Sequence, residues 1–270
     1  GEEILTRLAY KHEIAQKILD YREVQKLKST YIDALPEMIS PGDDRVHTSF
    51  NQAIAATGRL SSTNPNLQNI PIRTAKGREV RKAFVPRDKD YILMSSDYSQ
   101  IELRIMAHFA KDESMIKAFQ DGKDIHSITA SKIFQTGLAE VTQDMRRIAK
   151  TANFGIIYGI SVFGLSQRLN IPRGEASEII NSYFNEFKAV KIYMDKVINE
   201  ARDQGYVETI LGRRRYLRDI NSRNATMRGF AERNAINAPI QGSAADLIKI
   251  AMIKIQDYIL KENLRSKMIL

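Results

Sequence analysis

The sequence contains no cysteine, which excludes disulfide bonds and thiolate metal sites and fits a reducing cytoplasm. It also has no run of about 18 apolar residues, so we expect no transmembrane helix. No charged-then-apolar leader opens the chain, so no signal peptide is expected. Because the first residue is Gly1 rather than methionine, the chain is expected to be a fragment, and an upstream signal stays open.

Positive charge, by contrast, is abundant: 41 Lys and Arg stand against 32 Asp and Glu, a net charge of +9. This balance fits either a polyanion partner or a merely soluble basic protein. Residues 202–233 hold eight arginines against four acids, and residues 59–89 hold a second group of eight basic residues. The members of that group are Arg59, Arg73, Lys76, Arg78, Arg81, Lys82, Arg87 and Lys89. Arginine pairs with phosphate through two parallel hydrogen bonds, so such clusters favour nucleic acid or a triphosphate.

Apolar spacing predicts an α+β fold that is mostly helical, in one large domain or two modest ones. The predicted helices cover residues 3–34, 100–134, 142–157, 172–204, 225–236 and 242–263. The predicted strands are short pieces within 44–72, a buried strand over 91–95, and a hairpin of 206–211 with 215–220.

Asp97 follows the predicted strand 91–95, where side chains emerge from the edge of a sheet. A carboxylate there can bind Mg²⁺, which takes oxygen ligands and keeps positions open for phosphate. Alternatively, Asp97 caps the helix that follows it.

A second pattern places Arg146, Lys150, Phe154 and Tyr158 four residues apart, on one stripe of the predicted helix 142–157. The stripe is cationic toward the helix N-terminus and aromatic toward the C-terminus. It therefore matches a nucleoside triphosphate, with phosphates at the cationic end and a base at the aromatic end. An amphipathic helix with a solvated basic end and a buried aromatic end would show the same pattern.

Two further segments are suited to touching sugars, phosphates or base edges, and two smaller elements join them: a histidine suited to meet a phosphate and a basic hairpin turn. Residues 57–71 form a loop dense in short polar side chains around Arg59, and residues 232–246 carry amides on both sides of Pro239. Residues 124–126 end in a histidine, and residues 212–216 contain three consecutive arginines. Taken alone, each has a plainer interpretation. Residues 57–71 would be a surface loop, and residues 232–246 a helix that stops and restarts around proline. Residues 124–126 would hold an isolated histidine, and residues 212–216 a solvated run of charge.

Taken together and in this order, these segments resemble the family of bacterial DNA polymerase I, the family A DNA polymerases. The resemblance extends from residues 26–33 to residues 244–249. Residues 97–104 look like motif A of that family, and residues 146–159 look like motif B on its mobile O helix. The resemblance implies a right-hand fold: the end of the thumb over 1–40, palm over 41–105, fingers over 106–240, and the return to the palm over 241–270.

The resemblance also implies roles for individual residues at a catalytic centre. Asp97 would bind both of two Mg²⁺ ions, with the Tyr98 carbonyl as a second ligand. Glu102 would exclude a ribose 2′-hydroxyl, and Tyr158 would occupy the template position until the fingers close. The residues implied to hold the deoxynucleoside triphosphate are Gln100, Glu102, His126, Arg146, Lys150, Phe154 and Tyr158. Phenylalanine at position 154 further implies poor use of dideoxynucleotides.

The residues implied to contact primer–template DNA are Lys28, Arg59, Gln68, Asn69, Arg233, Asn237 and Gln241. The implied activity is two-metal addition of deoxynucleotides to a primer 3′-hydroxyl in DNA replication and repair, with Asp97, Arg146 and Lys150 as catalytic groups. We therefore expect a monomer, without a membrane partner, on the nucleoid of a bacterial cytoplasm.

The sequence departs from the family at motif C, because it contains no His-Asp-Glu triplet. Residues 267–270 look like the strand that leads into this motif, so little polymerase activity is expected of these 270 residues alone. A non-catalytic module that binds primer–template is the alternative. A single-subunit RNA polymerase is disfavoured by Glu102 and by the form of residues 59–71, and a P-loop ATPase by the absence of its phosphate-binding loop.

Overall fold

The computed structural model describes residues 1–72 and 74–269; Arg73, counted above in a basic cluster, and Leu270 lie outside the described residues. The chain divides into two compact units. One comprises Gly1–Ala55 with Leu60–Asp97, and the other comprises Ala56–Arg59 with Tyr98–Leu270. The predicted division into thumb, palm and fingers follows function rather than compactness, and it stays a prediction.

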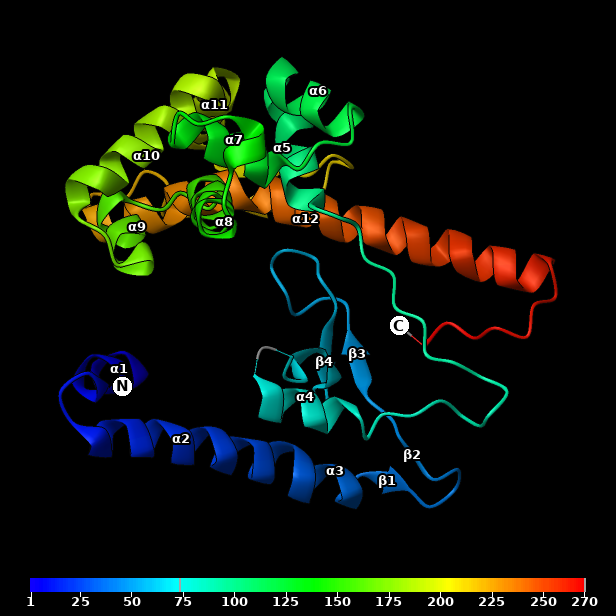
Figure 1. Cartoon of the computed structure of the whole chain (residues 1–270). Helices are drawn as coiled ribbons and strands as arrows, with labels where there is room; N and C mark the ends of the chain where they lie inside the picture. The colour runs from blue at the N-terminus through cyan, green and yellow to red at the C-terminus, as the bar shows by residue number, and fades with distance from the viewer. Residues whose placement is uncertain (73, 270) are drawn as a thin grey trace. The chain divides into compact units, whose positions relative to one another are not determined.

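The first unit begins with helices, as predicted for residues 3–34. They are α1 (Glu2–Ala9), α2 (Glu13–Leu27), a π-helical turn (Lys28–Asp33) and α3 (Ala34–Glu37). Two antiparallel pairs follow, β1 (Ile39–Ser40) with β2 (Arg45–Val46), and β3 (Ser49–Asn51) with β4 (Ser61–Thr63). A 3₁₀ turn (Leu67–Asn69) and α4 (Ala75–Arg81) complete the unit (Figure 1).

The predicted buried strand over residues 91–95 is wrong. This segment has no strand pairing among the described residues, and Ile92 and Met94 are 85% and 84% exposed. Apolar composition alone does not make a strand, because a strand also needs a neighbour for its backbone N–H and C=O groups. Asp97 therefore follows an extended segment rather than a sheet.

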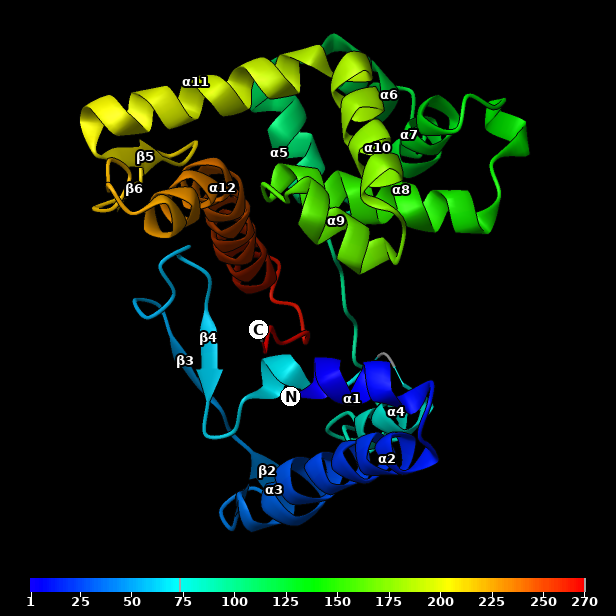
Figure 2. The same ribbon diagram turned by 90° about the vertical axis from the view of Figure 1, so that its left-hand side faces the viewer.

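The second unit contains most of the helices. They are α5 (Ile101–Ala110), α6 (Glu113–Gln120), α7 (Ile125–Ile133), α8 (Gln143–Ile157), α9 (Val162–Leu169), α10 (Arg173–Glu186), α11 (Lys188–Gln204) and α12 (Ala225–Lys261). A 3₁₀ turn (Leu138–Glu140) precedes α8, and β5 (Tyr206–Glu208) pairs with β6 (Arg214–Tyr216) between α11 and α12. Helix α12 packs against α5, α11 and β5, as Figures 1 and 2 show.

Side-chain caps explain where several helices begin. Asp112, Asp124, Thr142, Ser161 and Asn224 each accept a hydrogen bond from a backbone N–H in the first turn that follows. Such caps satisfy N–H groups that have no partner inside the helix. Helix α8 accordingly starts at the predicted position, with Thr142 as its cap.

Several predicted elements differ in extent from those observed. The stretch predicted as helical over 100–134 forms three helices, α5, α6 and α7. The helix predicted over 172–204 is broken at Phe187, whose φ and ψ of −108° and 62° are not helical. The hairpin is shorter than predicted, since its paired residues are 206–208 and 214–216.

The helix break predicted around Pro239 is also wrong, because α12 continues from Ala225 to Lys261 with Pro239 inside it. Proline lacks an N–H and normally disrupts a helix interior. Here Ala238, Pro239 and Ile240 are all buried, and burial of this stretch against the core offsets the loss of one hydrogen bond.

The core of the second unit is one cluster of buried side chains from α5 to α12. Tyr183 and Phe187 are among its largest members, with ring centroids 5.0 Å apart. Leu103 and Met106 join it from α5, and Ile156 joins it from α8. The helices that carry the predicted site residues are thus fixed to a common core.

Replacing Phe187 by alanine should lower the free energy of unfolding by about 3–5 kcal/mol, because it leaves a large cavity at the α10–α11 junction. Tyr183→Phe is the matched control. The Tyr183 hydroxyl is buried without a hydrogen-bond partner among the described residues, so its removal should not destabilise the fold. Urea denaturation followed by circular dichroism measures both; equal losses would contradict this account.

Candidate nucleotide and nucleic-acid site

The predicted cationic-to-aromatic stripe lies on α8, with Arg146 in its first turn and Tyr158 as its C-terminal cap. Lys150 is exposed, while Arg146, Phe154 and Tyr158 are half-buried. The rings of Phe154 and Tyr158 are 6.4 Å apart. The helix therefore presents positive charge at its N-terminal end and aromatic rings at its C-terminal end.

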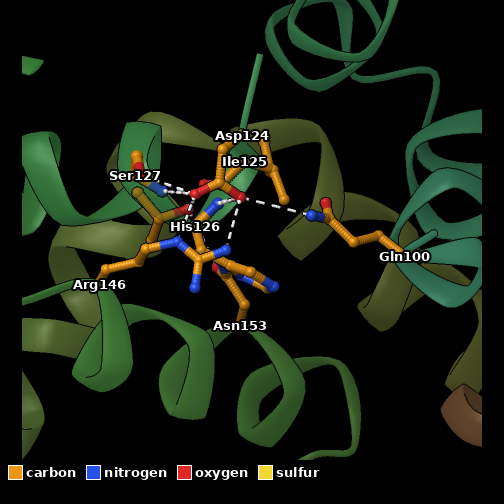
Figure 3. Close-up of polar contacts among 8 residues, drawn as sticks. Gln100, Asp124, Ile125, His126, Ser127, Arg146 and Asn153 are labelled. Atoms are coloured by element: carbon orange, nitrogen blue, oxygen red, sulfur yellow. Dashed lines mark hydrogen bonds and ion pairs between the residues drawn. The ribbon is translucent and has the colours of Figure 1, made fainter. Parts of the chain in front are cut away.

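Asp124, the cap of α7, lies at the centre of the polar cluster in Figure 3. Arg146 Nε donates to Asp124 Oδ2 at 2.7 Å, and Gln100 Nε2 donates to Oδ1 at 3.4 Å. Ser127 Oγ donates to Oδ2 at 2.6 Å. Although burial opposes the charge, Arg146 and Ser127 hold the pKa of Asp124 well below its usual range. One carboxylate thus holds two predicted nucleotide-binding side chains.

His126, predicted to meet a phosphate, is only 2% exposed. Asn153 Nδ2 donates to its Nδ1 over 2.9 Å, and the ring lies 5.7 Å from that of Phe154. Burial lowers the pKa of His126 to about 4, with the nearby Arg146 and Lys150 acting in the same direction and Asp124 opposing them. The imidazole is therefore neutral at pH 7 in this arrangement and is held by Asn153 rather than displayed to solvent.

At the aromatic end of the stripe, Glu102 in the first turn of α5 is only 9% exposed. Arg59 Nη2 donates to its Oε1 at 2.6 Å, and the Tyr158 hydroxyl donates to its Oε2. Burial and the adjacent Glu102 raise the pKa of Tyr158 above its usual range, so the hydroxyl keeps its proton. Arg59, Glu102 and Tyr158 come from three distant segments and form one cluster.

Helix α12 adds three of the predicted DNA-binding residues to this neighbourhood. Asn237 Nδ2 donates to the Tyr158 carbonyl at 3.4 Å, and Gln241 lies within hydrogen-bonding reach of the Tyr158 hydroxyl. Arg233 lies against Gly159 and lines a pocket with the end of α8 and the start of α9. Asn237 Oδ1 and Gln100 Oε1 are buried acceptors without a partner among the described residues.

Asp97 is the last residue of the first unit and Tyr98 belongs to the second, and both are exposed. The described residues include no group of three or more His, Cys, Asp or Glu side chains that could hold a metal ion. A carboxylate and a backbone carbonyl are nevertheless hard oxygen donors, and Mg²⁺ is commonly held by one or two carboxylates plus water and phosphate. The donor chemistry of Asp97 and Tyr98 fits Mg²⁺. Gln100 occupies the N-cap position of α5 without a side-chain cap hydrogen bond, so Asp97 is not the capping residue of this helix.

The remaining predicted DNA-binding residues belong to the first unit. Lys28 Nζ pairs with Asp33 at 2.6 Å. Gln68 Oε1 accepts from the backbone N–H of Ser62, and the Asn69 carbonyl accepts from the Tyr31 hydroxyl. Their predicted roles are not tested by these contacts.

Sequence reasoning missed the partners that hold the site residues in place. It singled out residues 124–126 for the histidine and overlooked the carboxylate of Asp124, although an Asp before a helix with Ser three positions later is a recognisable cap. Asn153 carried no comparable signal, because its partner His126 is 27 residues away in sequence.

Comparison with known proteins identifies the class. A family model described as DNA polymerase family A matches residues 1–270, and the chain belongs to that family. It is 54% identical over 268 residues to DNA polymerase I of Geobacillus stearothermophilus, covering 99% of this chain and 31% of that protein. It is 52% identical over 268 residues to DNA polymerase I of Bacillus subtilis (strain 168), covering 99% and 30%. The chain thus spans about a third of the length of these curated relatives.

Among solved structures, the chain resembles the POL domain of Pol1 from M. smegmatis in complex with DNA primer-template and dNTP. The TM-score is 0.94 and the identity 48%, over 100% of this chain and 48% of that one. This similarity confirms the predicted α+β, mostly helical polymerase fold. Separately, none of the helices within residues 1–72 and 74–269 is both long and apolar enough to span a membrane.

The pKa of His126 predicts a pH dependence of stability. A histidine in the unfolded chain has a pKa of about 6.5, whereas the folded structure lowers the pKa of His126 to about 4. Between these two pKa values, His126 is therefore protonated in the unfolded chain and neutral in the folded chain. The free energy of unfolding should fall as the pH falls through this window, by up to about 3 kcal/mol.

Urea denaturation at several pH values measures this slope, and His126→Gln should remove most of it. His12→Gln, at an exposed position before α2, is the control and should leave the slope unchanged. A slope that is identical in His126→Gln and the parent would assign the effect to other groups.

Proposed function

We propose that the residues of the candidate site form the nucleotide-binding and catalytic core of a DNA-templated DNA polymerase. Such an enzyme adds deoxynucleotides to a primer 3′-hydroxyl. The observation that carries the proposal is the stripe on α8, cationic at Arg146 and Lys150 and aromatic at Phe154 and Tyr158, with Glu102 held at its aromatic end. In a family A chain, this arrangement is complementary to a nucleoside triphosphate: the cationic end matches the phosphates, and the aromatic end matches the base.

Arg146 and Lys150 bind the phosphates of the incoming nucleotide, and the N-terminus of α8 adds favourable partial positive charge. Both side chains stabilise charge that develops on the transferring phosphoryl group. Arg146 must exchange its Asp124 partner for phosphate when it does so. His126 is neutral and buried, so its contact with phosphate requires α7 or α8 to shift as the nucleotide binds.

Glu102 acts on the sugar. Its buried carboxylate, fixed by Arg59 and Tyr158, occupies a defined position and excludes a ribose 2′-hydroxyl by contact. Phe154 packs against the sugar and base, and Tyr158 holds the template position until the fingers close. Release of Tyr158 from Glu102 on closure couples a correct base pair to assembly of the site.

Asp97 and the Tyr98 carbonyl supply oxygen ligands for Mg²⁺. Metal ions held there would supply the chemistry that lowers the pKa of the primer hydroxyl and stabilises a pyrophosphate leaving group. The 270 residues alone should show little extension, because a single carboxylate poorly compensates two divalent ions and no His-Asp-Glu triplet is present.

The partners of this proposal are primer–template DNA and deoxynucleoside triphosphates, which the related solved structure contains by description. The residues proposed to contact DNA are Arg59, Arg233, Asn237 and Gln241 in the second unit, and Lys28, Gln68 and Asn69 in the first. The proposal includes action as a monomer on the nucleoid DNA of a bacterial cytoplasm, in replication and repair.

Asp97→Asn in the full-length natural protein should lower single-nucleotide primer extension with Mg²⁺ by at least about 100-fold, because it removes a charged metal ligand. Asp90→Asn, at an exposed acid in the turn that precedes the segment of Asp97, should extend normally. The isolated 270 residues are assayed beside them. Extension that survives Asp97→Asn would remove Asp97 from the site, and primer–template binding without extension by any form would support a binding module instead.

Glu102→Ala in the full-length protein should raise the ratio of ribonucleotide to deoxyribonucleotide incorporation by about 10-fold or more, because the obstacle to a 2′-hydroxyl is gone. The ratio is measured from kcat/KM for the two nucleotides in single-turnover extension. Glu113→Ala, in the exposed first turn of α6, is the control. An unchanged ratio in Glu102→Ala would show that another group discriminates the sugar.

A further inference from the structure

We propose that Arg213 is a positioning residue of the nucleotide site: its guanidinium fixes the segment before Arg59 and the Gln241–Gly242 stretch of α12 relative to each other. This inference deepens the proposed polymerase function and rests on it. Arg213 lies in the basic segment 212–216 but is not among the individual residues predicted to contact nucleotide or DNA, and it stands in the turn between β5 and β6.

The turn holds the backbone of Arg213 firmly. The Thr209 N–H donates to the Arg213 carbonyl at 3.0 Å, and the Arg213 N–H donates to Thr209 Oγ1 at 3.1 Å. Gly212, at φ 77°, supplies the left-handed conformation that the turn needs. The side chain consequently leaves the hairpin from a fixed point.

The guanidinium is bound to α12 at two places. Its Nε and Nη2 lie 3.1 Å and 2.9 Å from Asp246 Oδ1, and Nη2 also donates to the Gly242 carbonyl at 2.9 Å. Asp246 is 9% exposed, and its Oδ2 has no hydrogen-bond partner among the described residues. A buried carboxylate so placed depends on Arg213 for compensation of its charge.

Two glycines, Gly58 and Gly242, allow the segment before Arg59 to lie close to the Arg213 guanidinium and to α12. A Cβ at Gly58, which has φ 75°, would collide with Cζ and both terminal nitrogens of Arg213. A Cβ at Gly242 would lie 3.1 Å from Arg213 Nη2 and 3.5 Å from the Thr57 carbonyl. The guanidinium therefore lies directly against the Gly58 backbone, with α12 on its other side.

Each held segment leads directly to the site. Arg59 follows Gly58 and donates to Glu102, and Gln241 precedes Gly242 and lies beside the Tyr158 hydroxyl. Glu102 and Tyr158 are themselves joined by a hydrogen bond. Arg213 thus contacts the residue next to Arg59, which holds the sugar-excluding carboxylate, and the residue next to Gln241, which lies beside the Tyr158 hydroxyl.

Only arginine suits this position. A planar guanidinium can donate to a carboxylate and a carbonyl along its edge while its face lies against a backbone, whereas a lysine ammonium is a compact point charge. Arg214, the next residue, offers a matched contrast. It pairs with Glu208 at 2.7 Å and lies over the Tyr206 ring, both on its own hairpin.

The test is a double-variant cycle in the full-length natural protein, using single-turnover extension with a matched deoxynucleotide. Arg213→Lys should lower kcat/KM by about 10-fold or more, since small displacements of site residues are costly. Arg59→Ala should also lower it, and the double variant should lose less than the product of the single losses, by about 5-fold or more. Arg214→Lys is the control and should lose less than about 2-fold.

Sugar discrimination separates positioning from general destabilisation. Acting through Arg59 and Glu102, Arg213→Lys should raise the ratio of ribonucleotide to deoxyribonucleotide use, whereas a loosened fold would lower both rates alike. If Arg213→Lys does not fold, Gly58→Ala, which keeps every charged group and displaces the guanidinium, takes its place in the same cycle.

The role of Arg213 would be overturned if the losses of kcat/KM in the single variants multiply in the double variant, or if the ratio of ribonucleotide to deoxyribonucleotide use is unchanged. Primer extension by the parent protein would in that case still support the proposed function. A parent protein that does not extend primers would overturn both proposals.

Discussion

The buried carboxylate of Glu102 is the constraint on which the candidate site depends. A carboxylate at 9% exposure must be compensated, and three elements supply that compensation: Arg59 by charge, Tyr158 by its hydroxyl, and the N-terminus of α5 by its dipole. Because these elements are far apart in sequence, satisfying one acid draws the loop before β4, the start of α5 and the end of α8 together. The same acid is the group proposed to sense the sugar, so stability and selectivity share one side chain.

The arrangement around Glu102 is supported from behind by packing. Helices α5, α8 and α12 carry site residues on one side and contribute Leu103, Ile156 and Ile240 to the common core on the other. A displacement of any one helix would therefore disturb both packing and polar contacts. The two glycines at 58 and 242 fit this view, because each allows closer approach than a larger residue would permit.

The sequence predicted local features well and distant partners poorly. The pattern over residues 142–157 predicted α8 closely, since periodicity is local. The predicted strand over 91–95 is wrong because apolar residues do not reveal whether a neighbouring strand is available for pairing. The predicted helix break at Pro239 is wrong because burial outweighs the loss of one hydrogen bond. The resemblance supplied the candidate residues, but the pairs Arg146–Asp124, His126–Asn153 and Arg213–Asp246 required the structure, since each joins residues at least 22 apart.

In the proposed function, the ion pair between Arg146 and Asp124 makes nucleotide binding an exchange of one ion pair for another. An anion that approaches α8 meets an arginine already neutralised by a carboxylate, so it gains only the difference between two ion pairs. A weakly charged anion gains little from this exchange, whereas a ligand with several negative charges can displace Asp124 and still engage Lys150. This end of α8 would therefore select ligands by the number of their negative charges rather than by the presence of one.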